Sequence, residues 1–167
     1  NSIPIFKEII CSMPDNLFFV SYVDHIDSTL YEPIKNLKNV KLITGRTYDL
    51  VKQSDVAVTV SGTASLEVAL LNIPQIVVYK TSYLSYLIGK MLLKINYISL
   101  VNLILNKQLI KELIQSDFNP KKVKGEINRI LSNNDYNNKI KNGYKEIIRV
   151  LNKRNVISKI ASHIMEK

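Results

Sequence analysis

The fold is decided by the stretch VAVTVSGTASLEVALLNIPQIVVY, residues 56–79. Two uncharged, β-branched runs at 56–60 and 75–79 enclose a stretch with helical character at 64–72, which ends in Asn-Ile-Pro. Strands that are apolar throughout predict a parallel sheet, because helices then cover both of its faces. Strand, helix and strand follow one another within these 24 residues. The stretch therefore predicts a compact, right-handed βαβ unit.

The same alternation extends outward from this unit. Residues 17–22 and 40–44 are further strand-like runs, and residues 1–13 have the apolar spacing of a helix. A short strand is predicted at 97–100, and only helices from Lys107 onward. Asn119 and Pro120 mark a helix start, and the Asn-rich segments at 132–134 and 152–155 mark breaks. We expect one domain over residues 1–167, with an α/β core at about 1–105 and a helical tail at about 106–167.

Composition narrows the class of protein. A chain of 167 residues with 46% hydrophobic content is long enough for one packed globular domain. Its single cysteine, Cys11, excludes an internal disulfide, and with two distant histidines, His25 and His163, no zinc-binding spacing is present. These features favour the cytoplasm. Because the chain begins with Asn1 inside a helical pattern, we interpret it as the C-terminal part of something longer.

The charge is unevenly distributed. Residues 1–80 contain 7 Lys and Arg against 8 Asp and Glu, a net charge of −1, whereas residues 81–167 contain 16 against 6, a net charge of +10. Such asymmetry suits an anionic surface, either membrane headgroups or nucleic acid, and a solvated lysine face is the alternative. Residues 82–94 are amphipathic and aromatic, which fits either a peripheral membrane face or burial against the sheet. Lys90 and Lys94 interrupt this stretch, so a membrane-spanning helix is not expected.

Candidate ligand-binding groups lie at the turn between the first strand and the helix of the βαβ unit. In open α/β sheets, ligands bind at the carboxyl ends of the strands, where a helix N-terminus offers N–H groups to a phosphate. Gly62 allows close approach to the backbone, while Ser61 and Thr63 add hydroxyl donors or simply cap the helix. Glu67 follows Thr63 by one turn, where its carboxylate could reach a ribose or act as a capping-box acid. The set is typical of a nucleotide site.

A longer pattern carries a family resemblance. SGTASLE at 61–67, Pro74, VVYK at 77–80, YISLVNLI at 97–104 and KELIQ at 111–115 follow one another in an order and spacing far more specific than any single piece. Together they resemble the C-terminal domain of lipid-A-disaccharide synthase, and the resemblance covers nearly the whole chain.

The resemblance implies the Rossmann-like, nucleotide-sugar-binding half of a GT-B fold. It implies transfer of 2,3-diacylglucosamine from UDP-2,3-diacylglucosamine to 2,3-diacylglucosamine 1-phosphate, with inversion and release of UDP. No metal or other cofactor is expected, because a helix N-terminus and nearby hydroxyls stabilise the leaving diphosphate in such enzymes. The expected setting is the cytoplasmic side of the inner membrane of a Gram-negative bacterium. The expected partners are an anionic membrane surface, the N-terminal half of the enzyme and, as a further option, a second copy of the chain.

The family's site residues map onto this sequence individually. Ser61, Gly62 and Thr63 match a turn that would contact the diphosphate, and Glu67 matches the acid that would hold the ribose. Asn102 matches a loop asparagine, while Glu112 and Gln115 match residues expected at the end of the next helix, on the donor side. The sequence departs from the family pattern at Val101, where the family has Pro, and at Lys111, where it often has another.

Two expected parts lie outside these residues. A second phosphate-binding loop is expected just before Asn1, and the catalytic base is expected in the N-terminal half, so no catalytic residue is assigned to this chain. A basic nucleic-acid-binding module is the rival from another class, although no nucleic-acid motif supports it. A GT-B enzyme for another UDP-sugar is the third interpretation, against which the segments at 97–104 and 111–115 argue.

Overall fold

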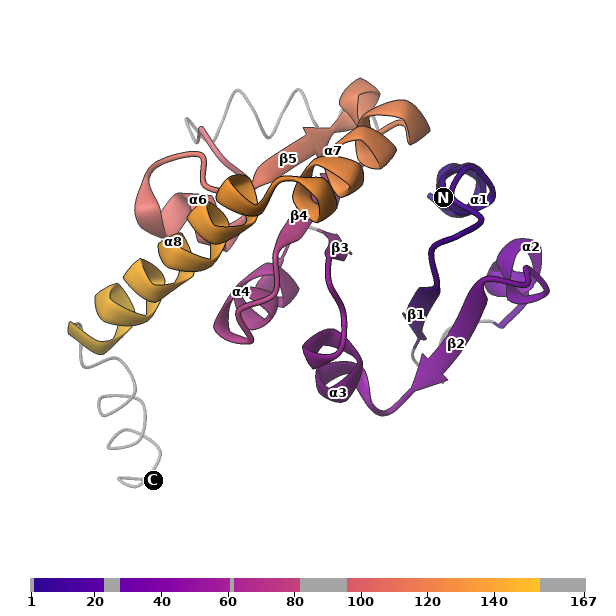
Figure 1. Ribbon diagram of the computed structural model, residues 1–167, viewed down its shortest axis with the longest axis horizontal. Helices are drawn as coiled ribbons and strands as arrows, with labels where there is room; N and C mark the ends of the chain where they lie inside the picture. Colours follow the sequence, from indigo (N-terminus) through magenta and orange to yellow (C-terminus); the bar gives the residue numbers. More distant parts are fainter. Residues whose placement is uncertain (1, 23–27, 61, 82–95, 154–167) are drawn as a thin grey trace.

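A computed structural model describes residues 2–22, 28–60, 62–81 and 96–153, and shows parallel strands alternating with helices (Figure 1). The described part of the chain ends in two long helices, the first of which crosses in front of the larger sheet in this view. In chain order the elements are α1 (Ile3–Cys11), β1 (Phe18–Tyr22), η1 (Ser28–Tyr31), α2 (Glu32–Lys35), β2 (Val40–Thr44), α3 (Thr47–Lys52), β3 (Ala57–Val60), α4 (Thr63–Leu70), β4 (Gln75–Tyr79), α6 (Leu100–Leu105), β5 (Lys111–Ile114), η2 (Gln115–Asp117), α7 (Pro120–Ser132) and α8 (Asn134–Lys153).

The strands pair in parallel, as the sequence predicts, but in two sheets within the described residues. β1 pairs with β2, and β3, β4 and β5 form the second sheet in that order. The register aligns Val60 with Val78 and Tyr79 with Ile114, so the carboxyl ends of β3, β4 and β5 lie at one edge. The predicted βαβ unit is therefore confirmed.

The central strand β4 explains why the apolar runs fold in this way. All of its residues but the last are buried, and Ile76, Val77 and Val78 are at most 1% exposed. Helix α4 ends at Leu70, where Asn72 adopts a left-handed φ of 61° before Pro74 starts the return to the sheet. This is the stop that Asn-Ile-Pro predicts, because proline cannot continue a helix.

Two predictions about the middle of the chain are wrong. Residues 97–100 do not form a strand: Ser99 caps α6 by accepting a hydrogen bond from the Asn102 N–H. The chain after Lys107 is not purely helical, because Lys111–Ile114 form β5, paired with β4. The sequence does not indicate this strand, because only two of its four residues are apolar. Glu112 and Gln115 therefore lie on or just after a strand rather than at the end of a helix.

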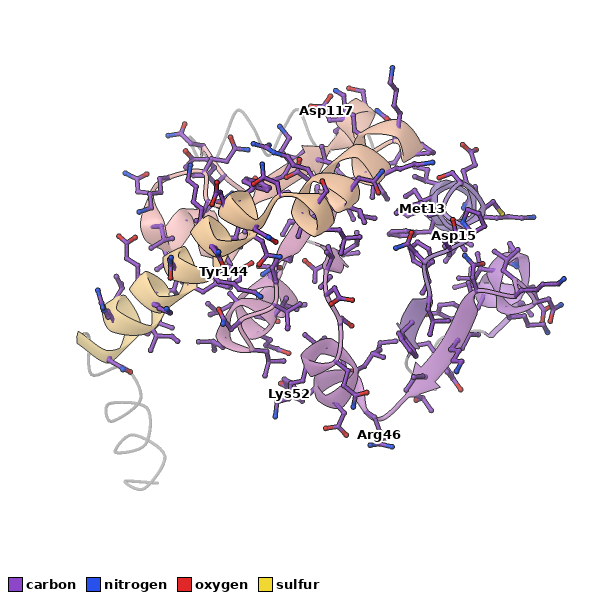
Figure 2. All side chains as sticks on the ribbon, viewed as in Figure 1. Met13, Asp15, Arg46, Lys52, Asp117 and Tyr144 are labelled. Atoms are coloured by element: carbon purple, nitrogen blue, oxygen red, sulfur yellow. The ribbon has the colours of Figure 1, made fainter. Side chains whose placement is uncertain are left out.

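The two long helices begin where the sequence predicts. Asn119 caps α7 by accepting a 3.0 Å hydrogen bond from the Lys122 N–H, and Pro120 is its first residue. Asn133 separates α7 from α8 and accepts a 2.8 Å hydrogen bond from the Tyr136 N–H. The apolar faces of both helices pack into the core that contains β4. The predicted break at 152–155 is not seen at 152 and 153, which still belong to α8, and 154–155 lie outside the described residues. Buried residues of this core from the two helices are Val123, Ile127, Ile130, Ile140, Tyr144, which Figure 2 labels, and Ile147.

Candidate nucleotide-binding site

The turn after β3 exposes the start of α4. Gly62 has φ 142° and ψ −161°, a conformation that residues with a side chain rarely adopt. Gly62 is the N-cap residue of α4, and no side chain among the described residues caps this helix end. The first N–H groups of a helix have no partners within it. Gly62 and Thr63 are both exposed, so this end offers donors to a ligand; Ser61, the third predicted residue, lies outside the described residues.

Ser65 fixes the turn from inside. Its side chain is fully buried, and its Oγ donates a 2.8 Å hydrogen bond to the Gly62 carbonyl, to which its N–H also donates at 3.3 Å. The Ser65 carbonyl in turn accepts a 2.7 Å hydrogen bond from Nε2 of the buried Gln75 on β4. The start of α4 is thereby attached to the central strand, so its direction is set by the core.

Glu67 lies one turn into α4 and is exposed. Its Oε2 accepts a 3.1 Å hydrogen bond from the hydroxyl of Tyr48, the second residue of α3. This hydrogen bond, together with the negative charge of Glu67, raises the pKa of Tyr48 above its usual value. The Tyr48 hydroxyl is the donor in this pair, because a carboxylate oxygen only accepts hydrogen bonds.

Gln115 lies at the same edge of the sheet, just after β5. Its Oε1 accepts a 2.9 Å hydrogen bond from the Thr81 N–H, and its Nε2 donates at 3.2 Å to the Thr81 carbonyl. The Gln115 side chain thus pairs with both backbone groups of Thr81, which lies two residues after the end of β4. Gln115 adopts a left-handed φ of 54°, which is uncommon for a residue other than glycine.

Asn102 lies in the interior, at the other end of β5. Its Oδ1 accepts hydrogen bonds from the N–H groups of Leu109 and Ile110 at 2.9 and 3.1 Å, and its Nδ2 donates to the Ile110 carbonyl and to Glu112. Leu109 and Ile110 precede β5, so this cluster lies at the amino end of the strand. Asn102 is fully buried.

The structure therefore brings together three of the predicted site residues, places a fourth at the same edge of the sheet and separates one. Gly62, Thr63 and Glu67 share the start of α4, and Gln115 lies at the carboxyl edge of the same sheet, whereas Asn102 lies toward the opposite edge. Tyr48 is a residue that the sequence reasoning missed. Its position, four residues after a predicted strand, was the available signal, because ligands collect at the carboxyl ends of strands.

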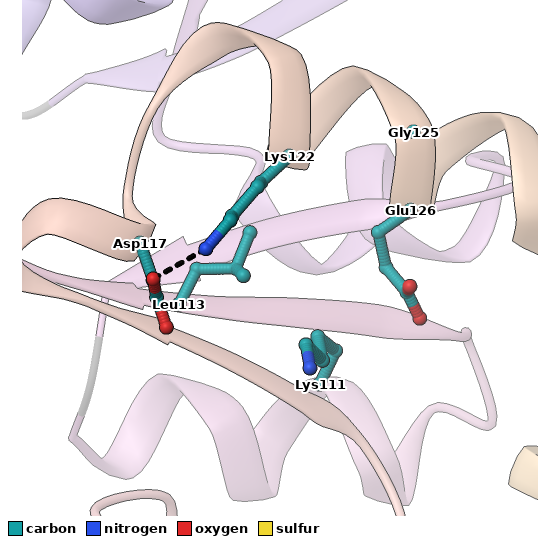
Figure 3. A pocket seen from close by; sticks show the side chains of 6 residues that line it. All are labelled: Lys111, Leu113, Asp117, Lys122, Gly125 and Glu126. Carbon is teal, nitrogen blue, oxygen red and sulfur yellow. Dashed lines mark hydrogen bonds and ion pairs between the residues drawn. The ribbon is translucent and has the colours of Figure 1, made fainter.

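A hollow lies elsewhere, between β5, η2 and α7 (Figure 3). It contains none of the predicted site residues, and its acids already have partners: Asp117 pairs with Lys122, and Glu126 accepts a hydrogen bond from the Tyr136 hydroxyl. Lys122 holds the pKa of Asp117 below its usual value. The hollow is lined by Lys111, Leu113, Asp117, Lys122, Gly125 and Glu126.

Two features are absent from the part of the chain that the structure describes. No three of the His, Cys, Asp and Glu side chains in these ranges gather closely enough to hold a metal ion. None of the helices placed by the structure is long and apolar enough to cross a membrane. Residues 82–94, for which the sequence predicts a membrane face or burial, lie outside the described ranges.

Parallel strands, covering helices and an exposed helix start after β3 define a Rossmann-like α/β protein. Within this class, residues 7–166 match the family described as lipid-A-disaccharide synthetase, and the chain belongs to that family.

Curated relatives carry the same name. The chain is 53% identical over 96 residues to the lipid-A-disaccharide synthase of Syntrophus aciditrophicus, covering 58% of this chain and 25% of that protein. It is 38% identical over 121 residues to the one of Anaeromyxobacter dehalogenans, covering 71% and 32% respectively. For Geobacter sulfurreducens the identity is 31% over 128 residues, covering 77% and 33%. The chain therefore spans a quarter to a third of the length of these relatives.

Proposed function

We propose that this chain is the donor-binding part of a lipid-A-disaccharide synthase. The whole enzyme would transfer 2,3-diacylglucosamine from its UDP donor to 2,3-diacylglucosamine 1-phosphate and release UDP. Family membership supports the reaction, and the exposed start of α4 with Glu67 one turn on is the observation that supports the donor site.

The proposed geometry assigns each group one task. The N–H groups at the start of α4, with the Thr63 hydroxyl, hold the diphosphate, because the positive end of a helix favours an anion. As the bond to the sugar breaks, charge builds up on the leaving UDP, and the same donors stabilise it. Glu67 accepts hydrogen bonds from the ribose hydroxyls. The acceptor sugar and its base belong to the part of the enzyme outside these residues.

Binding of UDP to the chain tests this function. Wild type should bind UDP, and Glu67→Ala should weaken binding about tenfold or more, because a hydrogen bond to a charged group contributes roughly 1.5–3 kcal/mol. Isothermal titration calorimetry measures both affinities. Glu146→Ala, which removes an exposed carboxylate on α8, is the matched control and should bind UDP as wild type does. Equal affinity of wild type and Glu67→Ala would remove Glu67 from the site.

The basic second half is proposed to face an anionic membrane surface. Acylated substrates must be drawn from a bilayer, and α7 and α8 contribute eight of the 16 Lys and Arg residues of residues 81–167 to the described structure, not counting the last residue of α8. Binding of this kind weakens as salt rises. Flotation with vesicles that contain or lack anionic lipid tests the proposal, and indifference to lipid charge would contradict it.

A further inference from the structure

The residue that contacts Glu67 comes from a different strand–helix unit. Tyr48 follows β2 by a short turn, whereas Glu67 lies on the helix after β3, and Figure 1 draws α3 beside α4. The 3.1 Å hydrogen bond between the Tyr48 hydroxyl and Glu67 Oε2 joins the two units. It therefore connects the proposed ribose carboxylate to a second element of the fold.

The exposure of Tyr48 is unusual for an aromatic residue on a short helix. Tyr48 is 57% exposed and Val60, the last residue of β3, is 58% exposed; among the large apolar side chains that the structure describes, these are the most exposed. Single exposed apolar residues are common. Here, however, Val60 ends β3 and Tyr48 follows β2 closely, so both lie near the start of α4, which no described side chain caps, and near a carboxylate. Apolar surface beside a few polar groups is the composition of a small-molecule site.

The hydrogen bond leaves part of Glu67 available. Tyr48 donates to Oε2, and within the described residues Oε1 of Glu67 has no hydrogen-bond partner. An exposed glutamate otherwise samples many rotamers, and fixing it in one on binding costs free energy. A tyrosine that already holds one oxygen reduces this cost, because the carboxylate is oriented before the ligand arrives.

We propose that Tyr48 is a positioning residue, which orients Glu67 so that its Oε1 meets the ribose hydroxyls of the donor. The proposal rests on the proposed function and adds a specificity role to it. Its consequence is selective: Tyr48 should matter for ligands that carry ribose hydroxyls, and little for ligands that lack them.

The experiment compares UDP with 2′,3′-dideoxy-UDP, by calorimetry on wild type and Tyr48→Phe. Wild type should prefer UDP. Tyr48→Phe keeps the ring and removes the hydroxyl, so its preference for UDP should fall about two- to tenfold, because Glu67 is no longer held in the orientation that meets the ribose hydroxyls. Affinity for the dideoxy ligand should change less than about twofold. In the Glu67→Ala background, Tyr48→Phe should cause no further loss, because the two residues act as one unit.

A second variant distinguishes loss of the Glu67 orientation from a general loss of folded structure. Tyr22→Phe makes the same chemical change on β1 and should leave the preference for UDP unchanged, while thermal unfolding checks that each variant is folded. An unchanged preference in folded Tyr48→Phe would overturn the positioning role while leaving the proposed function intact. If wild type binds neither nucleotide, the proposed function and this inference both fall.

Discussion

At the scale of single residues, the carboxylate of Glu112 is surrounded by hydrogen-bond donors. Its carboxylate accepts four hydrogen bonds, from the N–H groups of Ile98 and Ser99, from Ser99 Oγ and from Asn102 Nδ2, at 2.7–3.0 Å. Glu112→Gln would place an N–H₂ group opposite donors. We expect a loss of about 2 kcal/mol or more in the free energy of unfolding, because buried donors would be left unpaired. Urea unfolding followed by circular dichroism measures it.

Glu146 provides the matched control for this substitution. Its carboxylate forms a 2.6 Å ion pair with Lys107, but about half of each side chain is exposed. Exposed pairs contribute little because water screens them, so Glu146→Gln should cost less than about 1 kcal/mol. Equal losses from the two substitutions would show that the cluster around Glu112 is not the anchor that its geometry indicates.

At the scale of elements, two helical glycines should respond in opposite ways to the same change. A Cβ on Gly143 in α8 would lie 2.4 Å from both methyl carbons and 2.9 Å from Cγ of the buried Leu109. Overpacking of this kind costs roughly 1–3 kcal/mol, which exceeds the gain of about 0.5–1 kcal/mol in helix propensity. Gly143→Ala should therefore destabilise the protein by about 1 kcal/mol, as measured by chemical denaturation.

Gly125 in α7 is the control, because a Cβ there would meet no atom within 4 Å. Only the propensity gain remains, so Gly125→Ala should stabilise the protein by about 0.5–1 kcal/mol. A stabilising Gly143→Ala would contradict the packing of α8 on Leu109.

The elements also show what the sequence can and cannot predict. The strands β1 to β4 and the start of α7 were predictable, because apolar runs and the Asn119-Pro120 cap are local signals. β5 was not predictable, since residues 111–114 form a strand only by pairing with β4 and by placing Glu112 among donors from residues 98–102. The start of α4 was predictable from Ser-Gly-Thr, but the contact of Tyr48 with Glu67 was not, because it joins two units that are separated by a strand. Asn102 illustrates the same limit: family spacing selects the residue, but only packing shows that it is buried.

At the scale of the whole molecule, we expect the 167-residue chain alone to turn over no substrate. The inverting step needs a base for the acceptor hydroxyl and a facing half that positions the acceptor, and both are proposed to lie outside this chain. General base catalysis and positioning together contribute roughly seven powers of ten or more in rate. Stabilising the leaving diphosphate leaves the acceptor hydroxyl unactivated. Activity should appear only when the N-terminal part of the enzyme is supplied, in one chain or in trans.

Thin-layer chromatography of radiolabelled substrates would detect the disaccharide. If the purified chain makes it from UDP-2,3-diacylglucosamine and 2,3-diacylglucosamine 1-phosphate, a base must lie among these residues. Asp49 and Asp55 are the first to mutate, because they are close to the candidate site in sequence. The carboxylate of Asp49 already forms a 3.1 Å ion pair with Arg46. Asp55 precedes β3 and so lies at the amino end of the strand, away from Gly62. Asp49 is engaged by Arg46 and Asp55 lies at the wrong end of β3, which is the structural reason to expect no turnover.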